Sequence, residues 1–334
     1  MTRHSEETAM TTPAIDAAAL EKLISAAVAA PSVHNSQPWR FRLSEDISSL
    51  ELRVSDDRPL PAIDPDGRAL YLSVGAALLN LRTAARRLGW APEVRLLPDS
   101  EAPDLVASVV LDRPSPVALP LTGRLYDAIW RRHTVRTPFT GEPVPAAVLD
   151  DLAEAARAEE ADLSFPDREE TTRLLDLAVR AERRSAADPA RRAEDRSAVH
   201  EPGGPARGIP VAALGPHDTA GRIPVRDFAG TGRPRSAAFE AEPCLAVLTT
   251  AHDRPRDWIR AGMALEHALL LATVHHVRAG LLHELVEWPD LRAAAQDPDR
   301  GPGHVQMLVR LGYGPEGSPT PRLPVGDVLE ISRP

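Results

Sequence analysis

Cysteine and lysine are almost absent from this chain of 334 residues. Cys244 is the single cysteine, so a disulfide within the chain and a cysteine-based metal cage are both excluded. Lys22 is the single lysine and follows no glycine-rich loop, which excludes nucleotide hydrolysis by a P-loop. Schiff-base chemistry on a lysine is disfavoured for the same reason.

The chain also lacks an excess of positive charge and long apolar runs. Its formal net charge is −9, and binding to a phosphate backbone normally needs a basic face, so nucleic acid is not an expected partner. The N-terminus has no apolar signal core, and no run reaches membrane-spanning length. We therefore expect a soluble, cytoplasmic protein without a membrane partner. The hydrophobic fraction of 43 % is sufficient for a sizeable core.

Hydrophobic periodicity predicts an α+β fold. The pattern indicates helices at 16–30, 68–88, 122–132, 146–157, 168–185 and 256–279. It indicates strands at 40–43, 50–54, 93–97, 105–111, 162–165, 244–250 and 304–311. Residues 1–14 are polar and aperiodic, so we expect them to be disordered. The helices at 68–88 and 256–279 hold similar positions relative to their strands, which suggests an internal duplication.

Residues 185–236 interrupt this pattern. They contain seven prolines and seven glycines, a density at which packed elements become uncommon. One interpretation is a disordered linker. The other is a long ordered lid over a site, which long loops inside a domain often form. Six apolar anchors favour a lid that packs on the protein: Ile209, Val211, Leu214, Ile223, Val225 and Phe228.

The stretch "AAPSVHNSQPWRFRL", from Ala29 to Leu43, concentrates short hydrogen-bonding side chains between a predicted helix and a predicted strand. Serine, asparagine and glutamine bond to nearby backbone, so one interpretation is an elaborate turn. The other is a polar ligand cradle. His34, Asn35 and Gln37 suit the edge of a flat heterocycle, and Pro38–Trp39 supplies a rigid apolar wall.

A second polar stretch is "RRHTVRTPFTGEPVP", which begins at Arg131. Arg132, Thr134 and Arg136 alternate, so their side chains share one side of an extended segment. Several arginines and a hydroxyl form a suitable phosphate site, and the alternative is a solvated basic surface. Near the C-terminus, Arg322 lies on a backbone stiffened by flanking prolines, which suits an anchor with a fixed target.

Histidines are the remaining candidates for metal ligands. His267, His275 and His283 are eight residues apart, and this spacing drifts around a helix. Zinc-binding helices use the tighter i, i+4 spacing, and no carboxylate pair converges on these histidines. The sequence therefore predicts no metal site.

Three motifs together resemble the nitroreductase superfamily of FMN proteins. Members carry Arg-Arg-Ser-x-Arg, Pro-Ser-x-x-Asn-x-Gln-Pro-Trp and a C-terminal Thr-Pro-Arg. The matching segments here are Arg132-His133-Thr134-Val135-Arg136, Pro31-Ser32-Val33-His34-Asn35-Ser36-Gln37-Pro38-Trp39 and Thr320-Pro321-Arg322. The resemblance covers the chain from about residue 16 to 331.

The order of the motifs is similar to that of the Acg-like branch, in which two nitroreductase units are fused into a single-chain pseudo-dimer. In ordinary members the arginine segment comes first, and the FMN lies between the subunits of a homodimer. The resemblance therefore implies a nitroreductase fold with a first unit at 15–118, a second unit at 119–334 and a lid insertion at 185–236. One FMN site per chain would form across the two units, and the protein would be a monomer or a homodimer.

The resemblance also implies the roles of ten cofactor-binding residues. The isoalloxazine or ribityl chain would contact Ser32, His34, Asn35 and Gln37, beside Pro31. The phosphate would contact Arg132, Thr134, Arg136 and Arg322, beside His133. His276 replaces a usual glycine, and Glu284-Leu285 replaces a usual Gln-Pro, in the segment expected to pass the flavin.

The implied activity is an NAD(P)H-dependent two-electron reduction of nitroaromatics or quinones through flavin N5. The flavin carries the chemistry, so no side chain is assigned a catalytic role. The alternative is a flavin-binding or flavin-sequestering protein whose lid closes the active site. The two hypotheses differ in turnover with NAD(P)H and a small-molecule electron acceptor.

Overall fold

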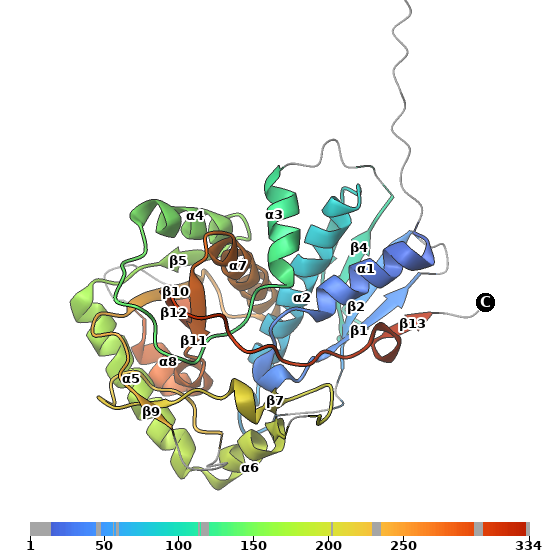
Figure 1. Cartoon of the computed structure of the whole chain (residues 1–334). Coiled ribbons are helices and arrows are strands. Elements are labelled where there is room, and N and C mark those ends of the chain that lie inside the picture. The colour runs from blue at the N-terminus through green and yellow to red at the C-terminus, as the bar shows by residue number, and fades with distance from the viewer. Residues whose placement is uncertain are drawn as a thin grey trace, which may run out of the picture.

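Two β-sheets flank a central group of helices in the computed structural model (Figure 1). The structure describes residues 15–44, 48–55, 57, 60–112, 114, 120–201, 203–228, 235–296 and 303–331. The stretch 1–14, which the sequence predicts to be disordered, lies outside the described residues. Helices and antiparallel strands both contribute to the fold, as the α+β prediction requires.

The first sheet is built by the N-terminal part of the chain and one C-terminal strand. Its order is β13 (Leu329–Ile331), β1 (Trp39–Leu43), β2 (Ser49–Val54), β4 (Leu105–Val110) and β3 (Glu93–Leu96). All pairs are antiparallel except β1 with β13, where Phe41 lies opposite Leu329. Figure 1 shows the red β13 beside the blue β1. The C-terminus is thereby tied to the first half of the chain.

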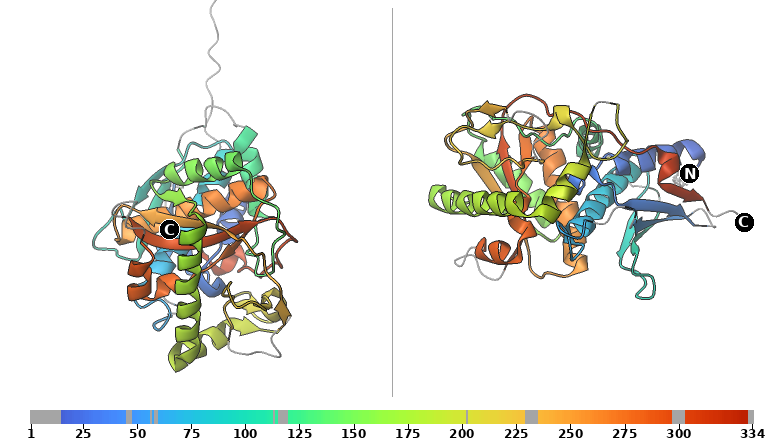
Figure 2. Two further views of the ribbon diagram at one scale, coloured as in Figure 1. Left: turned by 90° about the vertical axis from the view of Figure 1, so that its left-hand side faces the viewer. Right: turned by 90° about the horizontal axis from the view of Figure 1, so that it is seen from below.

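The second sheet lies on the other side of the central helices (Figure 2). Its order is β11 (Arg278–Leu281), β12 (His304–Gly312), β10 (Cys244–Thr250) and β5 (Asp162–Ser164), with every pair antiparallel. After its first residue, β12 is buried along its length. Burial on both faces explains why apolar residues are frequent along it, and its polar residues Gln306 and Arg310 are buried too.

The helices form the layer between the sheets and the outer wall of the second half. They are α1 (Ala17–Val28), α2 (Arg68–Arg87), α3 (Pro120–Ile129), α4 (Ala146–Arg157), α5 (Arg168–Ala187), α6 (Pro189–Ala198), α7 (Pro255–Val274) and α8 (Pro289–Ala294). The Asp16 carboxylate caps α1 by accepting from the Ala19 amide at 2.7 Å. Within the described residues, no helix combines the length and apolar character needed to cross a membrane.

Helices α2 and α7 pack directly against each other through two glycines. A Cβ added at Gly75 would lie 2.1 Å from the Ile259 carbonyl oxygen, and one added at Gly262 would lie 2.0 Å from that of Leu72. Only glycine permits this approach, because backbone atoms cannot yield as a flexible side-chain tip does. This contact sets how closely α2, from the first half of the chain, packs against α7, from the second half.

Replacing Gly75 by alanine is therefore expected to lower the free energy of unfolding by about 3 kcal/mol, the upper end of the usual cost of overpacking. The matched control is Gly123→Ala in α3, where an added Cβ meets nothing within 4 Å. Because alanine favours a helix more than glycine does, the control should gain up to about 1 kcal/mol. Urea denaturation of both variants measures the difference, and equal stabilities would contradict the close-packing argument.

Several sequence predictions of secondary structure are wrong. The helix expected at 256–279 ends at Val274, and residues 278–281 form β11, which was not predicted. The left-handed backbone of His276 (φ 61°) follows the helix end and turns the chain toward that strand.

The region 185–236 contains more regular structure than its composition predicts. Helix α5 continues to Ala187, and α6 follows as a second helix that the sequence did not indicate. Beyond α6, the described residues form short strands: β6 (Val199–His200), β7 (Ile209–Pro210), β8 (His217–Asp218) and β9 (Ser236–Ala237). Ile209, Ile223 and Phe228 are buried, so three of the six predicted anchors pack inside the protein.

Candidate functional site

One cavity is lined by segments from both halves of the chain. They are the loop after α1, one face of α2, the stretch after α3, one residue each of α5 and α7, Ile209, five residues of the segment 223–228, residues 280–285 from β11 onward, two residues of β12 and the loop before β13. Nine of the ten predicted cofactor-binding residues line it: Pro31, Ser32, His34, Asn35, Arg132, His133, Thr134, Arg136 and Arg322. The tenth, Gln37, is fully buried outside the lining.

The loop after α1 has an unusual backbone. His34, Asn35 and Gln37 adopt left-handed conformations with φ values of 51°, 51° and 52°. Side chains rarely tolerate this region, and such residues concentrate where the surroundings hold them for a function. The Ser32 hydroxyl accepts from the Gln37 amide at 3.0 Å, and Ser73 of α2 accepts from the Val33 amide at 3.1 Å.

The side chains of Asn35 and Gln37 form hydrogen bonds with other segments of the protein. Asn35 Nδ2 donates to the Gly208 carbonyl at 2.8 Å, and its Oδ1 accepts from Arg322 Nη1 at 3.0 Å. Gln37 Nε2 donates to the Ala206 carbonyl at 2.7 Å, and its Oε1 accepts from the Leu323 amide at 2.9 Å. The loop is therefore an elaborate turn that joins three segments, and it also forms one wall of the cavity.

His34 is held as a neutral ring. Arg226 Nη1 lies 2.8 Å from its Nε2, and the ring of Phe228 meets it edge-on at a centroid distance of 5.3 Å. Burial holds the His34 pKa well below its ordinary value, and the positive charge of Arg226 lowers that pKa further. The histidine therefore adds polarity to the cavity wall without adding charge near neutral pH.

Two arginines converge at one end of the cavity. Arg132 Nη2 and Arg322 Nη2 both donate to the Ala29 carbonyl, at 3.4 and 3.1 Å. The nearby carboxylate is Glu266 of α7, whose Oε1 lies 3.4 Å from Arg132 Nε. Burial, with the neighbouring Arg132 charge, lowers the Arg322 pKa to about 9, while burial raises the Glu266 pKa to about 7. Positive charge thus exceeds negative charge at this end.

Arg136 contacts a different part of the cavity. Its Nη1 donates to the Ala213 carbonyl at 3.2 Å, and its guanidinium lies 5.8 Å from the Phe228 ring centroid. Burial and the nearby charge of Arg226 lower the Arg136 pKa to about 10. Thr134 forms a parallel bridge with Ala279 of β11, so the segment is extended, as predicted. The structure thus brings Arg132 and Arg322 together and gives Arg136 other partners.

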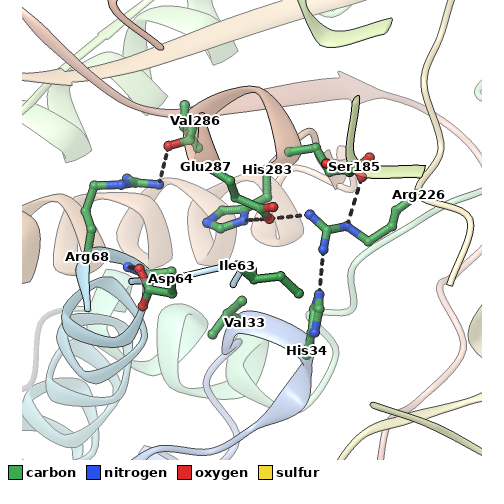
Figure 3. Close-up of polar contacts among 12 residues, drawn as sticks. Val33, His34, Ile63, Asp64, Arg68, Ser185, Arg226, His283, Val286 and Glu287 are labelled. Atoms are coloured by element: carbon green, nitrogen blue, oxygen red, sulfur yellow. Dashed lines mark hydrogen bonds and ion pairs between the residues drawn. The ribbon is translucent and has the colours of Figure 1, made fainter. Parts of the chain in front are cut away.

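A buried charged cluster, which the sequence did not indicate, lies beside His34, and Figure 3 shows Arg226 and Glu287 within it. Arg226 is its centre: it pairs with Asp195 at 2.9 Å, contacts Glu287 closely and lies 3.6 Å from Glu284. Arg191 Nη1 pairs with Glu287 Oε2 at 2.7 Å. These residues come from three separate stretches of the chain. The spacing of these residues along the sequence therefore could not predict the cluster.

Comparison with known proteins identifies the class. The family model described as "Nitroreductase family" matches residues 1–63. A Mycobacterium tuberculosis protein named "Putative NAD(P)H nitroreductase Rv3131" is 32 % identical over 331 residues, covering 96 % of this chain and 94 % of that protein. The chain belongs to the nitroreductase family.

Further relatives from Mycobacterium tuberculosis extend over similar lengths. "Putative NAD(P)H nitroreductase acg" is 30 % identical and covers 93 % of this chain and 95 % of its own. "Uncharacterized protein Rv3127" is 30 % identical, covering 93 % of both chains. Among solved structures, an FMN-bound nitroreductase from Desulfitobacterium hafniense is 14 % identical with a TM-score of 0.39, covering 63 % of this chain and 98 % of that one.

Proposed function

We propose that this chain is an FMN-dependent oxidoreductase that uses NAD(P)H to reduce nitroaromatics or quinones by two electrons. The observation that carries the proposal is the buried pair Arg132 and Arg322. Two like charges close together in a buried site are unfavourable, and burial, with the neighbouring Arg132 charge, lowers the Arg322 pKa. An anion bound between them would remove it.

The residues at this end fit the phosphate of FMN. Arg322 Nε is buried and has no hydrogen-bond partner among the described residues, and Arg132 Nε has only the long 3.4 Å contact with Glu266. Arginine forms strong charge-assisted bonds with phosphate oxygens. Thr134 and His133, which also line the cavity, add a hydroxyl and a ring nitrogen. The phosphate would therefore lie beside Arg132 and Arg322, with Glu266 behind them.

The other end of the cavity suits the ring system. Residues of segment 223–228 supply apolar surface, and His34 and Phe228 meet there edge to face. The sequence predicted Arg136 at the phosphate, but its contacts with Ala213 and Phe228 favour a role near the ring. When bound, FMN supplies hydride transfer from NAD(P)H to the acceptor. A buried cation such as Arg136 would stabilise negative charge on a reduced ring.

One FMN per chain follows from the source of the lining residues. The loop after α1 and α2 belong to the first predicted unit, 15–118, and the arginine segment and β11 belong to the second, 119–334. Both units contribute to one cavity, which supports a single-chain pseudo-dimer. The β13 strand, which pairs with β1, crosses from the second unit to the first. Such a chain completes its site without a partner, as a monomer or within a homodimer.

The test is the visible spectrum of the purified protein with FMN, before and after NADPH is added. We expect a flavin spectrum that bleaches with NADPH and recovers when menadione or a nitrofuran accepts the electrons. A preparation that stays flavin-free in excess FMN would contradict the proposal.

Sequestration of flavin is the second candidate, and one observation favours it. Segment 206–228 is held beside the cavity: Asn35 and Gln37 donate to the Gly208 and Ala206 carbonyls, and Arg226 pairs with Asp195. A lid fixed in this way would leave little room for nicotinamide. A flavin that dithionite reduces but NADPH does not would support sequestration over turnover.

A further inference from the structure

The cavity has two electrically different ends. Arg132 and Arg322 make one end positive. At the other end, Arg136, Arg226 and the carboxyl group of Glu284 all line the cavity. Glu284 is the single carboxylate side chain among the described residues that line the cavity. It is the first residue of the short helix η3 (Glu284–Glu287). Residues 280–283, at and after the end of β11, line the cavity just before it.

Glu284 is weakly paired compared with its neighbours in the cluster. Arg226 Nη1 is engaged by Asp195 at 2.9 Å, and its Nη2 contacts Glu287. The Arg226 Nε lies 3.6 Å from Glu284 Oε1, beyond hydrogen-bond length. Glu287 also pairs with Arg191 and accepts from His283. Arg226 therefore bonds mainly to Asp195 and Glu287. Glu284 makes only the longer contact with Arg226, and its side chain lines the cavity.

Charged groups on several neighbouring elements act on the Glu284 carboxyl group. Arg226 is the principal cation, and its positive charge favours the carboxylate form. Negative charge comes from Glu182 of α5, Asp195 of α6 and Glu287 of η3, and it opposes ionisation. Arg136, Arg191, His34 and His283 are further titratable groups near this end.

The two glutamates of η3 have opposite proton affinities. Burial raises the Glu284 pKa to about 7, and the acidic neighbours add to that shift. Arg226 and His283 hold the Glu287 pKa far below its ordinary value. Two carboxyl groups whose surroundings separate their pKa values are typical of a site in which one supplies protons and the other stays ionised.

We propose that Glu284 is the acid that protonates an oxygen of the electron acceptor. The inference rests on the proposed function, in which NAD(P)H supplies a hydride through FMN. A quinone becomes a hydroquinone by gaining two electrons and two protons. The hydride brings both electrons and one proton, and the Glu284 O–H bond breaks to supply the other. The carboxylate that remains lies beside Arg226 Nε and regains its proton from water.

The experiment compares Glu284→Gln with Glu284→Asp and with the control Glu182→Gln. Glu182 is a neighbouring acid on α5 that does not line the cavity. Each variant is loaded with FMN and assayed with NADPH and one of two acceptors. Menadione needs a proton for each hydride, whereas ferricyanide takes single electrons and no proton. The acceptor pair therefore separates proton delivery from flavin reduction.

Glu284→Gln should lower kcat with menadione by about 100-fold, the lower end of the range for general acids, and leave ferricyanide reduction unchanged. In the wild type, kcat with menadione should fall as the pH rises above about 7. The glutamine variant should lose this dependence, and Glu284→Asp should retain it. Glu182→Gln should keep the wild-type kcat at low pH, with the fall shifted to slightly lower pH because Glu284 loses one acidic neighbour. Equal losses with both acceptors, or an unchanged pH profile, would overturn the assignment.

A second readout needs no turnover. Infrared difference spectra of the oxidised, FMN-loaded protein should show a protonated carboxyl band that titrates near neutral pH and is lost in Glu284→Gln, while the separate contribution of Glu266 remains. Absence of that band from the wild type would contradict the proposal while leaving the flavin function standing. Failure to bind FMN at all would instead remove the proposed function. The two failures are therefore distinguishable.

Discussion

Replacing Arg132 and Arg322 together by methionine is expected to weaken FMN binding by about 1,000-fold or more, since losing a charged hydrogen-bonding partner costs about 2 kcal/mol or more at each position. Methionine keeps the apolar stem and removes the charge. The folded protein should tolerate this change, because the two buried guanidiniums oppose each other and burial already favours the neutral form of Glu266. Fluorescence titration of FMN measures the affinity.

The matched control for this pair is Arg184→Met. Arg184 packs on the Trp288 ring at 3.8 Å and pairs with Asp290 on the surface, away from the cavity. This variant should bind FMN as the wild type does. Thermal melting without FMN checks that the double variant is folded. Wild-type affinity in a folded double variant would show that the phosphate binds elsewhere.

Replacing Arg226 by methionine is expected to lower the free energy of unfolding by about 3–5 kcal/mol, the usual cost of removing one partner of a buried ion pair. Asp195 and Glu287 would then lie buried without their main cation. The same change releases His34 from its hydrogen bond and frees segment 206–228 from the cluster. If that segment excludes NADPH, flavin reduction should become faster in the variant.

The destabilisation should depend on pH. In the wild type the folded-state pKa of Glu287 lies below its unfolded value, so this group stabilises the fold above about pH 4.3 and loses that effect as the pH falls. Without Arg226, burial would raise the folded pKa, and the stability of the variant would fall as the pH rises. Urea denaturation should therefore show a larger deficit at pH 8 than at pH 5. An equal deficit would contradict this account.

Local patterns predicted most of the regular elements well. Helix α2 and strand β10 match their predicted bounds to within one residue, because a continuous apolar face or run ends at clear polar residues. The misses have physical reasons. The chain reverses at His276 without a glycine to mark the turn. Strand β13 is short, and it exists because β1 offers it an edge.

The candidate site was likewise predicted only in part. The motifs named nine residues of the cavity wall, because loops that hold a ligand keep turn formers and arginines close together in the chain. They did not separate Arg136 from the pair Arg132 and Arg322. An alternating segment specifies one side of the backbone, but packing decides which neighbour each long side chain meets.

The sequence alone determined the family resemblance, the α+β character and the two polar segments, because these depend on residues that are neighbours in the chain. Only the tertiary structure decided that Arg226 sits among Asp195, Glu284 and Glu287. It also decided that α2 and α7 meet through Gly75 and Gly262. Burial and electrostatics act between groups that are close in space, and no spacing along the chain encodes those distances.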